Sequence, residues 1–220
     1  MSLQTIIDNA TSIQIVRNKL AGQTITRSGL VRIGSVASYT PFQFVVDFKA
    51  GFRYSENREL AEEINRLDRV FLSTINIGSS NAGLAYITKY LGVLDATQIG
   101  QISVDSYNGL DLVLDMTNVQ GEVSSDVVFR PGDFLQLDSG YKYPYVVTAE
   151  VLRGTGNTIT VPLHRPFKAQ SGYNAVGKGL LVGPDVTWQV VMTKKPAVEI
   201  VPYDLLSFTD AFELVEVIED

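Results

Sequence analysis

Short segments in which apolar and polar residues alternate recur along this chain. Residues 42–49 and residues 110–116 each place an apolar side chain at every second position. A period of two residues is that of a β-strand with one buried face. The predicted buried faces are Phe42, Phe44, Val46 and Phe48 in the first segment and Leu110, Leu112, Leu114 and Met116 in the second. Further strands are predicted at residues 145–152, 158–161, 186–192 and 211–218.

Two turn signals separate these segments. Residues 130–133 read Arg-Pro-Gly-Asp, in which proline presets φ at the second turn position and glycine accepts a positive φ at the third. We expect strands on both sides of this turn. Residues 154–157 read Gly-Thr-Gly-Asn and predict a hairpin that joins 145–152 to 158–161.

One segment has the periodicity of a helix. Between Ser55 and about Arg69, the residues Leu60, Ile64 and Leu67 are spaced so that they share one helical face. The Ser55 hydroxyl is predicted to cap this helix by accepting a hydrogen bond from a free backbone N–H. We expect the helix to lie across a sheet, with its three apolar residues in the core.

The segments together predict a mainly β fold of the α+β type. Successive strands joined by short turns pair as antiparallel hairpins, which favours a split β-barrel or a sandwich with one embedded α-helix. Residues 1–40 are interrupted by glycines, and we expect them to form an N-terminal arm. Residues 41–220 are expected to form the β-barrel domain, with two sub-halves that meet near residue 120, where the sequence is polar.

The composition excludes several kinds of site. The 220 residues include no cysteine and a single histidine, His164. Disulfides, thiolate nucleophiles and cysteine-bound zinc or iron–sulfur centres are therefore excluded, and so is a metal site with several histidine ligands. We expect no cofactor, no metal and a non-enzymatic role.

The charge balance argues against nucleic-acid binding. The chain has 18 Lys and Arg against 24 Asp and Glu, which gives a net charge of −6. Binding to phosphate backbones depends on clustered cations, so we expect DNA to be repelled. No apolar run approaches the roughly 20 residues of a transmembrane helix, and the N-terminal residues lack the pattern of a secretory signal. We therefore expect synthesis in the cytosol and no membrane partner.

Two groups of polar residues are candidates for catalysis. His164 lies at a predicted strand end between two prolines, without a nucleophile motif such as Gly-x-Ser-x-Gly, which favours a hydrogen-bonded structural histidine. Paired carboxylates could hydrolyse glycosides, although turn preference and solubility also account for them. The candidate pairs are Asp133 with Asp138 and Asp204 with Asp210.

The densest aromatic cluster lies at residues 141–145, Tyr-Lys-Tyr-Pro-Tyr. Tyr141, Tyr143 and Tyr145 suit a protein interface, because tyrosine offers rigid contact area with a polar tip. Two other interpretations stay open. One is a strand entry with one ring buried and the others partly covered, and the other is a platform on which sugars stack.

Several of these segments occur together in one known group of proteins. They are Phe-Arg-Pro-Gly-Asp-Phe-Leu-Gln at 129–136, Tyr-Pro-Tyr-Val-Val-Thr at 143–148, Thr-Ile-Thr-Val-Pro-Leu-His-Arg-Pro at 158–166, Val-Thr-Trp-Gln-Val at 186–190 and Phe-Glu-Leu-Val-Glu-Val at 212–217. In this order they resemble the C-terminal half of distal tail or baseplate hub proteins of tailed bacteriophages. Residues 51–58 and 77–87 also resemble phage tail sequence, so the resemblance covers about residues 40–220.

The resemblance implies a structural virion protein. Such proteins form a six-fold ring on a split β-barrel with an α-helix, and the ring joins the tail tube to the baseplate or to receptor-binding proteins. It implies a homo-hexamer, assembly in the host cytoplasm and a final location in the phage tail. Related proteins often add a sugar-binding domain after the ring domain. This chain is expected to lack one and to act as an adaptor.

The residues agree with this interpretation on physical grounds. Extended arms and open sheet edges allow neighbours in a ring to exchange strands. An acidic channel would let DNA pass without specific binding. Within the same class, a tail-tube initiator or a baseplate wedge subunit is the alternative. From other classes, the alternatives are a carbohydrate-binding β-sandwich module that uses Tyr141, Tyr143 and Tyr145, and then a carboxylate hydrolase.

Overall fold

The computed structural model describes residues 3–17, 21–25, 31–35, 40–48, 52–66, 72–78, 83–138 and 140–218. The chain is mainly β, with antiparallel sheets and a half-barrel. It divides into two compact units. Unit 1 comprises Met1–Val16, Phe42–Lys89 and Gly183–Asp220, and unit 2 comprises Arg17–Pro41 and Tyr90–Val182. Unit 2 thus contains two insertions into the chain of unit 1.

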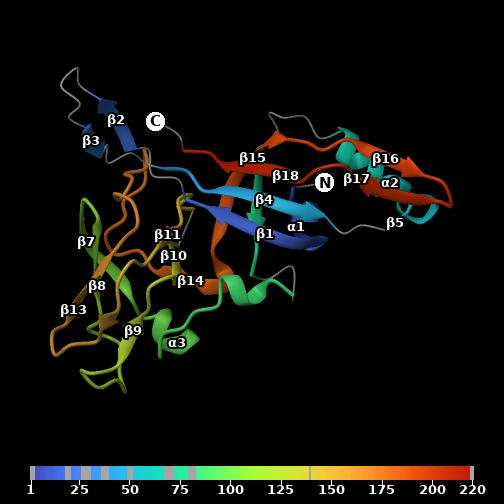
Figure 1. Ribbon diagram of the computed structural model, residues 1–220. Helices are drawn as coiled ribbons and strands as arrows, with labels where there is room; N and C mark the ends of the chain where they lie inside the picture. Colours follow the sequence, from blue (N-terminus) through green and yellow to red (C-terminus); the bar gives the residue numbers. More distant parts are fainter. Residues whose placement is uncertain are drawn as a thin grey trace. The chain divides into compact units, whose positions relative to one another are not determined.

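Unit 1 is built on a five-stranded antiparallel sheet, ordered β1-β4-β18-β15-β6. Figure 1 shows its strands side by side. The strands are β1 (Ala10–Val16), β4 (Gln43–Phe48), β6 (Ser73–Asn76), β15 (Thr187–Lys194) and β18 (Phe212–Glu216). Trp188 on β15 is fully buried, and its ring meets those of Phe42 and Phe44 edge-on at 6.2 and 5.6 Å. The predicted buried face of residues 42–49 is confirmed, since Phe42, Phe44, Val46 and Phe48 are all buried.

The short helix α1 (Gln4–Asp8) covers the β6 edge of this sheet. The Gln4 side-chain amide donates to the Asn76 carbonyl at 2.8 Å and accepts from the Asn76 backbone N–H at 2.6 Å. Both backbone groups of Asn76 are therefore satisfied by one side chain, which takes the place of a further strand. Leu3, Ile6 and Ile7 are fully buried and hold the helix in place.

Unit 1 also contains a smaller sheet, ordered β16-β17-β5. Its strands are β5 (Phe52–Arg53), β16 (Val198–Val201) and β17 (Leu205–Phe208), and helix α2 (Tyr54–Arg66) follows β5 directly. A 3₁₀ turn lies at Ala85–Ile87 (η1) and another at Gly183–Asp185 (η2).

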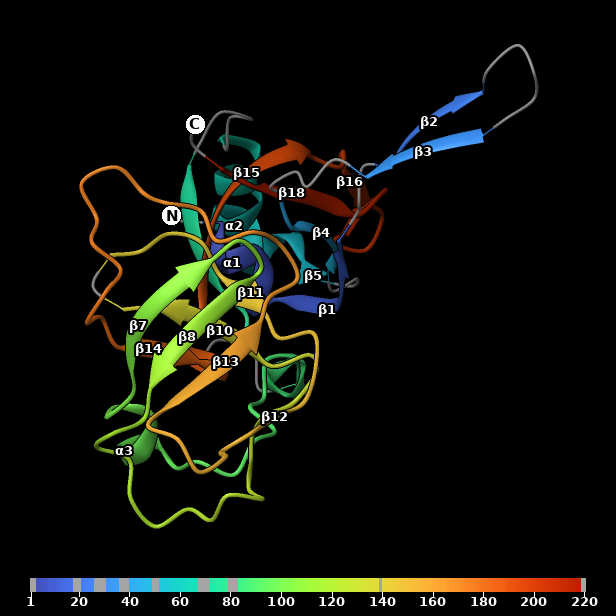
Figure 2. The ribbon, with the colours of Figure 1, turned by 90° about the vertical axis from the view of Figure 1, so that its left-hand side faces the viewer.

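Unit 2 contains several small antiparallel sheets. Figure 2 shows β7 (Ser103–Asn108), β8 (Asp111–Asp115) and β13 (Thr158–Pro162) side by side, with β8 in the centre. A second sheet joins β10 (Phe134–Leu137) to β11 (Tyr145–Val146) and β14 (Leu180–Val182). The remaining pairs are β9 (Val127–Phe129) with β12 (Val151–Leu152) and β2 (Ala21–Ile25) with β3 (Val31–Ser35), and the unit also has helix α3 (Ala96–Ile99).

The structure corrects the predicted hairpin across residues 154–157. β12 pairs with β9, whereas β13 pairs with β8. The cause is a set of bonds from the turn to a distant segment: Arg153 N donates to Asp126 O at 2.8 Å, and Gly154 N donates to Ser124 O at 3.0 Å. These bonds direct β12 toward the 124–127 segment instead of toward the strand that follows it.

One residue of the second predicted buried face differs from the expectation, and the predicted turn at 130–133 is confirmed. Leu112, Leu114 and Met116 are fully buried as predicted, but Leu110 is 50% exposed because it lies in the turn before β8 begins. The turn at 130–133 is confirmed: Asp133 N donates to Arg130 O at 3.0 Å, Gly132 has φ 102°, and β9 and β10 flank it.

The described chain has three α-helices where the sequence analysis expected one. Helix α2 overlaps the predicted range of Ser55 to about Arg69 but begins one residue earlier and ends at Arg66, with Ala61 buried on it. The Ser55 prediction is wrong, because its hydroxyl donates to the Asp204 carboxylate instead of capping the helix. The side chains of Leu60 and Ile64, and all of Leu67, lie outside the described residues, so their role in the core stays a prediction.

The division into an arm (1–40) and a barrel domain (41–220) also stays a prediction. Within residues 1–40, β1 belongs to the sheet of unit 1, and β2 and β3 form a two-stranded sheet of their own. Residue 120, the expected meeting point of two sub-halves, lies inside unit 2.

Candidate functional site

The three tyrosines of the predicted interface lie in the interior of unit 2. Tyr141, Tyr143 and Tyr145 are 3%, 2% and 0% exposed. Tyr141 and Tyr145 stack on Phe167, with ring centroids 5.4 and 5.6 Å apart and nearly parallel planes. Tyr143 meets Tyr141 edge-on at 5.5 Å. Because these rings are covered, they offer no open face on which a sugar could stack, and their role at an interface stays a prediction.

The hydroxyls of this cluster join two loops. The oxygens of Tyr141 and Tyr145 lie 2.6 Å apart, and Tyr141 also donates to Lys168 O at 2.6 Å. Lys168 N donates to the Tyr145 hydroxyl at 2.8 Å. Burial raises the pKa of Tyr141 far above its ordinary value, and the neighbouring Tyr145 raises it further. The Tyr141 hydroxyl therefore stays neutral, and the hydrogen bonds of the two hydroxyls hold the loop after Phe167 against the strand entry.

His164 and Arg165 support the same region. Val146 N donates to Nδ1 of His164 at 3.0 Å, so this nitrogen acts as an acceptor in a structural bond. The buried Arg165 donates to Thr40 O at 3.0 Å and to Pro144 O at 2.8 Å, and its guanidinium lies 5.3 Å from the Tyr145 ring centre. This is the arrangement of a hydrogen-bonded structural histidine beside a buried cation.

Each candidate carboxylate has a separate set of partners. Asp133 is 1% exposed and accepts from Leu91 N at 2.9 Å and from Arg130 N at 2.7 Å. Burial raises the pKa of Asp133, and these two bonds oppose the rise. Asp210 forms an ion pair with Lys194 at 3.3 Å. Within the described ranges, no group of acidic residues and histidine is arranged to hold a metal ion.

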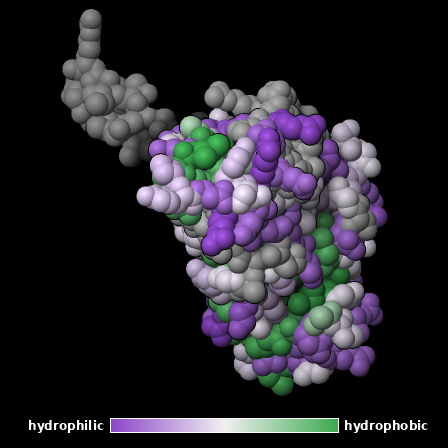
Figure 3. All heavy atoms as spheres, turned by 90° about the vertical axis from the view of Figure 1, so that its right-hand side faces the viewer, coloured by the Kyte–Doolittle hydropathy of each residue, from purple (hydrophilic) through white to green (hydrophobic). Residues whose placement is uncertain are grey.

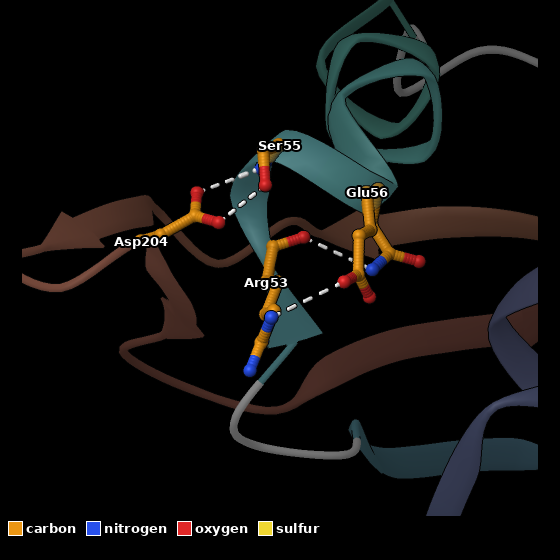
Figure 4. A network of polar contacts seen from close by, with 5 residues as sticks. Arg53, Ser55, Glu56 and Asp204 are labelled. Carbon is orange, nitrogen blue, oxygen red and sulfur yellow. Dashed lines mark hydrogen bonds and ion pairs between the residues drawn. The ribbon is translucent and has the colours of Figure 1, made fainter.

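Asp204 stabilises a feature that the sequence analysis did not predict, which we call the braced turn, residues 202–204 between β16 and β17. Its carboxylate accepts from Ser55 N at 2.8 Å and from the Ser55 hydroxyl, and its carbonyl accepts from Tyr54 N at 2.9 Å. Figure 4 shows Asp204 facing Ser55, with Arg53 and Glu56 beside them. The bonds from Ser55 lower the pKa of Asp204, so the brace is anionic at neutral pH.

The backbone of the braced turn is strained. Tyr203 has φ 71° and Asp204 has φ 64°, and these are the two non-glycine residues with positive φ in the part of the chain that the structure describes. The left-handed region costs a residue with a side chain roughly 1–2 kcal/mol, which is why glycine or asparagine usually occupies such turns. The brace from α2 holds both residues in this conformation.

Unit 2 exposes a set of apolar residues around β9. Val93 N donates to Val127 O at 3.0 Å, and Val127 pairs with Leu152 on β12. Val93 is 53% exposed and Leu152 is 48% exposed. Figure 3 shows green, apolar side chains gathered toward the lower end of the face that it draws. Because large apolar side chains are exposed together here, this part of unit 2 is a surface available for contact.

The two edges of the five-stranded sheet differ in whether an element of the described chain covers them. α1 closes the β6 edge through Gln4. On the other edge, no described strand pairs with β1 on the side away from β4. β1 reads Ala-Thr-Ser-Ile-Gln-Ile-Val, without charge or proline, and Thr11, Ser12 and Gln14 are exposed on it. Edge strands of this kind pair readily with another strand.

Some of these features left a signal in the sequence. Asp95 and Gln98 form a capping box at the start of α3, and this spacing could have predicted the helix. Gln4 left none, because its partner Asn76 is 72 positions away. A scan against protein-family models and a search of curated proteins found no match to this chain. Among the described helices, none has the length and apolar character needed to cross a bilayer.

Proposed function

We propose that this chain is a non-enzymatic structural protein of a bacteriophage tail. Copies of it form a closed ring, which joins the tail tube to the baseplate or tail tip and lets DNA pass. The resemblance of residues 40–220 to distal tail and hub proteins suggests six copies, assembled in the host cytoplasm and retained in the virion. The neighbours in the tail are the tube on one side and baseplate or receptor-binding proteins on the other.

The observation that carries this proposal is the open edge of β1. An uncharged seven-residue edge strand is a hazard for a monomer, because it can pair with any extended chain. The opposite edge is closed by a dedicated helix, so this fold does protect one of its two edges. A neighbouring copy that adds a strand to β1 would complete the sheet.

The β2–β3 sheet is a second observation that supports the proposal. It has two strands, and a two-stranded sheet is marginally stable alone. The open β1 edge and the separate two-stranded sheet are two different surfaces. Each of them could contact a neighbouring copy. Contacts between different surfaces close into a ring when their rotation fits, whereas a self-matching surface produces a dimer.

The finer architecture belongs to the same proposal. The half-barrel becomes part of a split β-barrel, and α2 supports it as the embedded helix through Leu60, Ile64 and Leu67. The net charge of −6 suits a channel for DNA, because like charges keep the phosphate backbone from adhering. No cofactor and no membrane surface are needed for this role.

Electron microscopy of the purified chain tests this proposal. We expect negatively stained particles to be rings with a central hole, and a reconstruction to show acidic side chains around the hole. Particles without a hole at high protein concentration would overturn the proposal. So would a channel lined by lysine and arginine, because such a lining would retain DNA.

A further inference from the structure

The braced turn displays an aromatic side chain that contacts little of its own chain. Tyr203 is 96% exposed, and Ile200 and Leu205, on the two strands that the turn joins, are 58% and 40% exposed. Ile200 lies opposite Leu206 in the register, so Ile200 and Leu205 project from the two faces of the hairpin on either side of the turn. Scattered apolar residues are ordinary on a surface, but here three lie within six positions at the end of one hairpin. Figure 3 shows a compact group of apolar side chains over the β16 region at the upper left, with polar side chains around it. We call these three residues the tip.

Burial inside the molecule does not compensate for the strain in the braced turn. The positive φ values of Tyr203 and Asp204 would be relieved by glycine at either position. The Tyr203 ring lies in solvent, so burial does not compensate for the strain. Strained backbone that the surroundings hold in place is found at functional sites, where it fixes a conformation in advance.

The brace makes the tip rigid. Asp204 accepts two hydrogen bonds from Ser55, and Tyr54 N donates to the Asp204 carbonyl. Leu205 is paired with Arg53 on β5, so the turn is tied to the neighbouring strand as well. Figure 4 shows the two bonds between Ser55 and the Asp204 carboxylate, at the first turn of α2. A turn whose backbone is fixed in this way loses little backbone freedom when it binds a partner.

The polar residues around the tip are mainly acidic. Asp204 lies next to Tyr203, and exposed Glu199 lies on β16 next to Ile200. Arg53 is a cation close to the turn, and it is paired with an acid, since its guanidinium is 3.5 Å from the Glu56 carboxylate. The rim of the tip is therefore negative, and it complements a positive surface.

From these observations we infer that the tip is a docking knob for a second protein, one that presents an apolar pocket bordered by lysine or arginine. Tyrosine is enriched among the residues that dominate binding energy at interfaces. A second copy of this chain is the alternative occupant, and the test below distinguishes it from such a partner. The inference does not depend on the proposed ring, since the tip belongs to the β16–β17 hairpin and not to the β1 edge.

Selection from displayed peptides tests the inference with a defined probe. The full chain is presented to three pools of random peptides, each rich in Leu, Phe and Trp and enriched in Lys and Arg, in Asp and Glu, or in neither. We expect binders from the basic pool, and we expect Tyr203→Ala to weaken them by about tenfold or more. Ser55→Ala keeps the aromatic ring of Tyr203 but removes the hydroxyl bond of the brace, so it should weaken binding by about two- to tenfold.

Tyr86→Ala is the matched control, because Tyr86 is 71% exposed on η1 and lies outside the tip. It should leave the affinity of the selected peptides unchanged. Absence of binders from the basic pool, selection from the acidic pool, or equal binding to Tyr203→Ala would each overturn the inference. Self-association of the chain that Tyr203→Ala abolishes would also overturn it, because the occupant would then be a second copy. A ring that persists in Tyr203→Ala leaves the proposed function standing whatever the peptides show.

Discussion

At one edge of the five-stranded sheet, β6 meets a helix whose first residue bonds both backbone groups of Asn76. At the other edge, β1 presents seven uncharged residues, and no described strand covers its outer side. The two edges belong to the same sheet and share the same core, so their difference is not a consequence of packing. The comparison shows that this fold closes one edge with a helix of its own chain, and it is the basis of our proposal that β1 pairs with a strand of a neighbouring copy.

The largest effect is expected from removing the support of the closed edge. Ile6 is a fully buried residue of α1, and Ile6→Ala should lower the free energy of unfolding by about 2–4 kcal/mol. Loss of α1 would also open the β6 edge, so light scattering of the variant should rise on heating. Ile15→Ala on the half-buried side of β1 is the control, with less than half the loss. An equal loss in both variants would show that α1 has no special role at the edge.

Two glutamines allow a direct comparison of the edges. Gln4→Ala removes both bonds to Asn76 and should lower the free energy of unfolding by about 1–2 kcal/mol. Gln14 is exposed on β1, and Gln14→Ala should change that quantity by less than about 0.5 kcal/mol. Chemical denaturation at low protein concentration measures both. The comparison fails if Gln14→Ala is the more damaging change in the monomer.

A charge on each edge sharpens the comparison at the level of assembly. Gln14→Lys places an ammonium on β1 and should weaken association between copies by about tenfold. Thr74 is exposed on β6, which is already closed, so Thr74→Lys should leave association unchanged. Sedimentation velocity across a dilution series measures the association constant. The reverse order of effects would mean that β6 is the edge that pairs.

The smallest effect concerns the braced turn, which lies on neither edge of this sheet. Hydrogen bonds from Ser55 lower the pKa of Asp204 below 3.8 in the folded chain. The stability that Asp204 contributes is therefore present above about pH 3.8 and is lost as the pH falls through the lower folded pKa. Asp204→Asn should flatten the fall in Tm between about pH 5 and about pH 2. Asp133, whose pKa is raised, changes the pH dependence of Tm in the opposite direction. Its contribution is the same in the original chain and in Asp204→Asn, so it cancels when the two are compared.

Local features of the fold were predictable from the sequence, and the pairing of strands was not. The period of residues 42–49 predicted the buried face of β4, because alternation is a property of neighbouring residues. The hairpin at 154–157 failed because bonds to Ser124 and Asp126 decide the partner of β12, and no local pattern reports them.

The candidate site shows the same limit. Tyr141, Tyr143 and Tyr145 were identifiable as a cluster, but an aromatic run is equally compatible with an interface and with a core. Tyr141 and Tyr145 are buried where they stack on Phe167, which is more than twenty positions away, and Tyr143 packs against Tyr141. The braced turn also depends on distant residues, since Ser55 and Asp204 are 149 positions apart. Contacts of this kind require the three-dimensional structure.

The native mass of the purified chain across a concentration series tests the central claim, that the open β1 edge assembles copies into a closed ring. The account predicts one closed species of about 145 kDa, six times 24.1 kDa, that does not grow further as concentration rises. A monomer of 24.1 kDa at every concentration, or a mass that increases without limit, would contradict it.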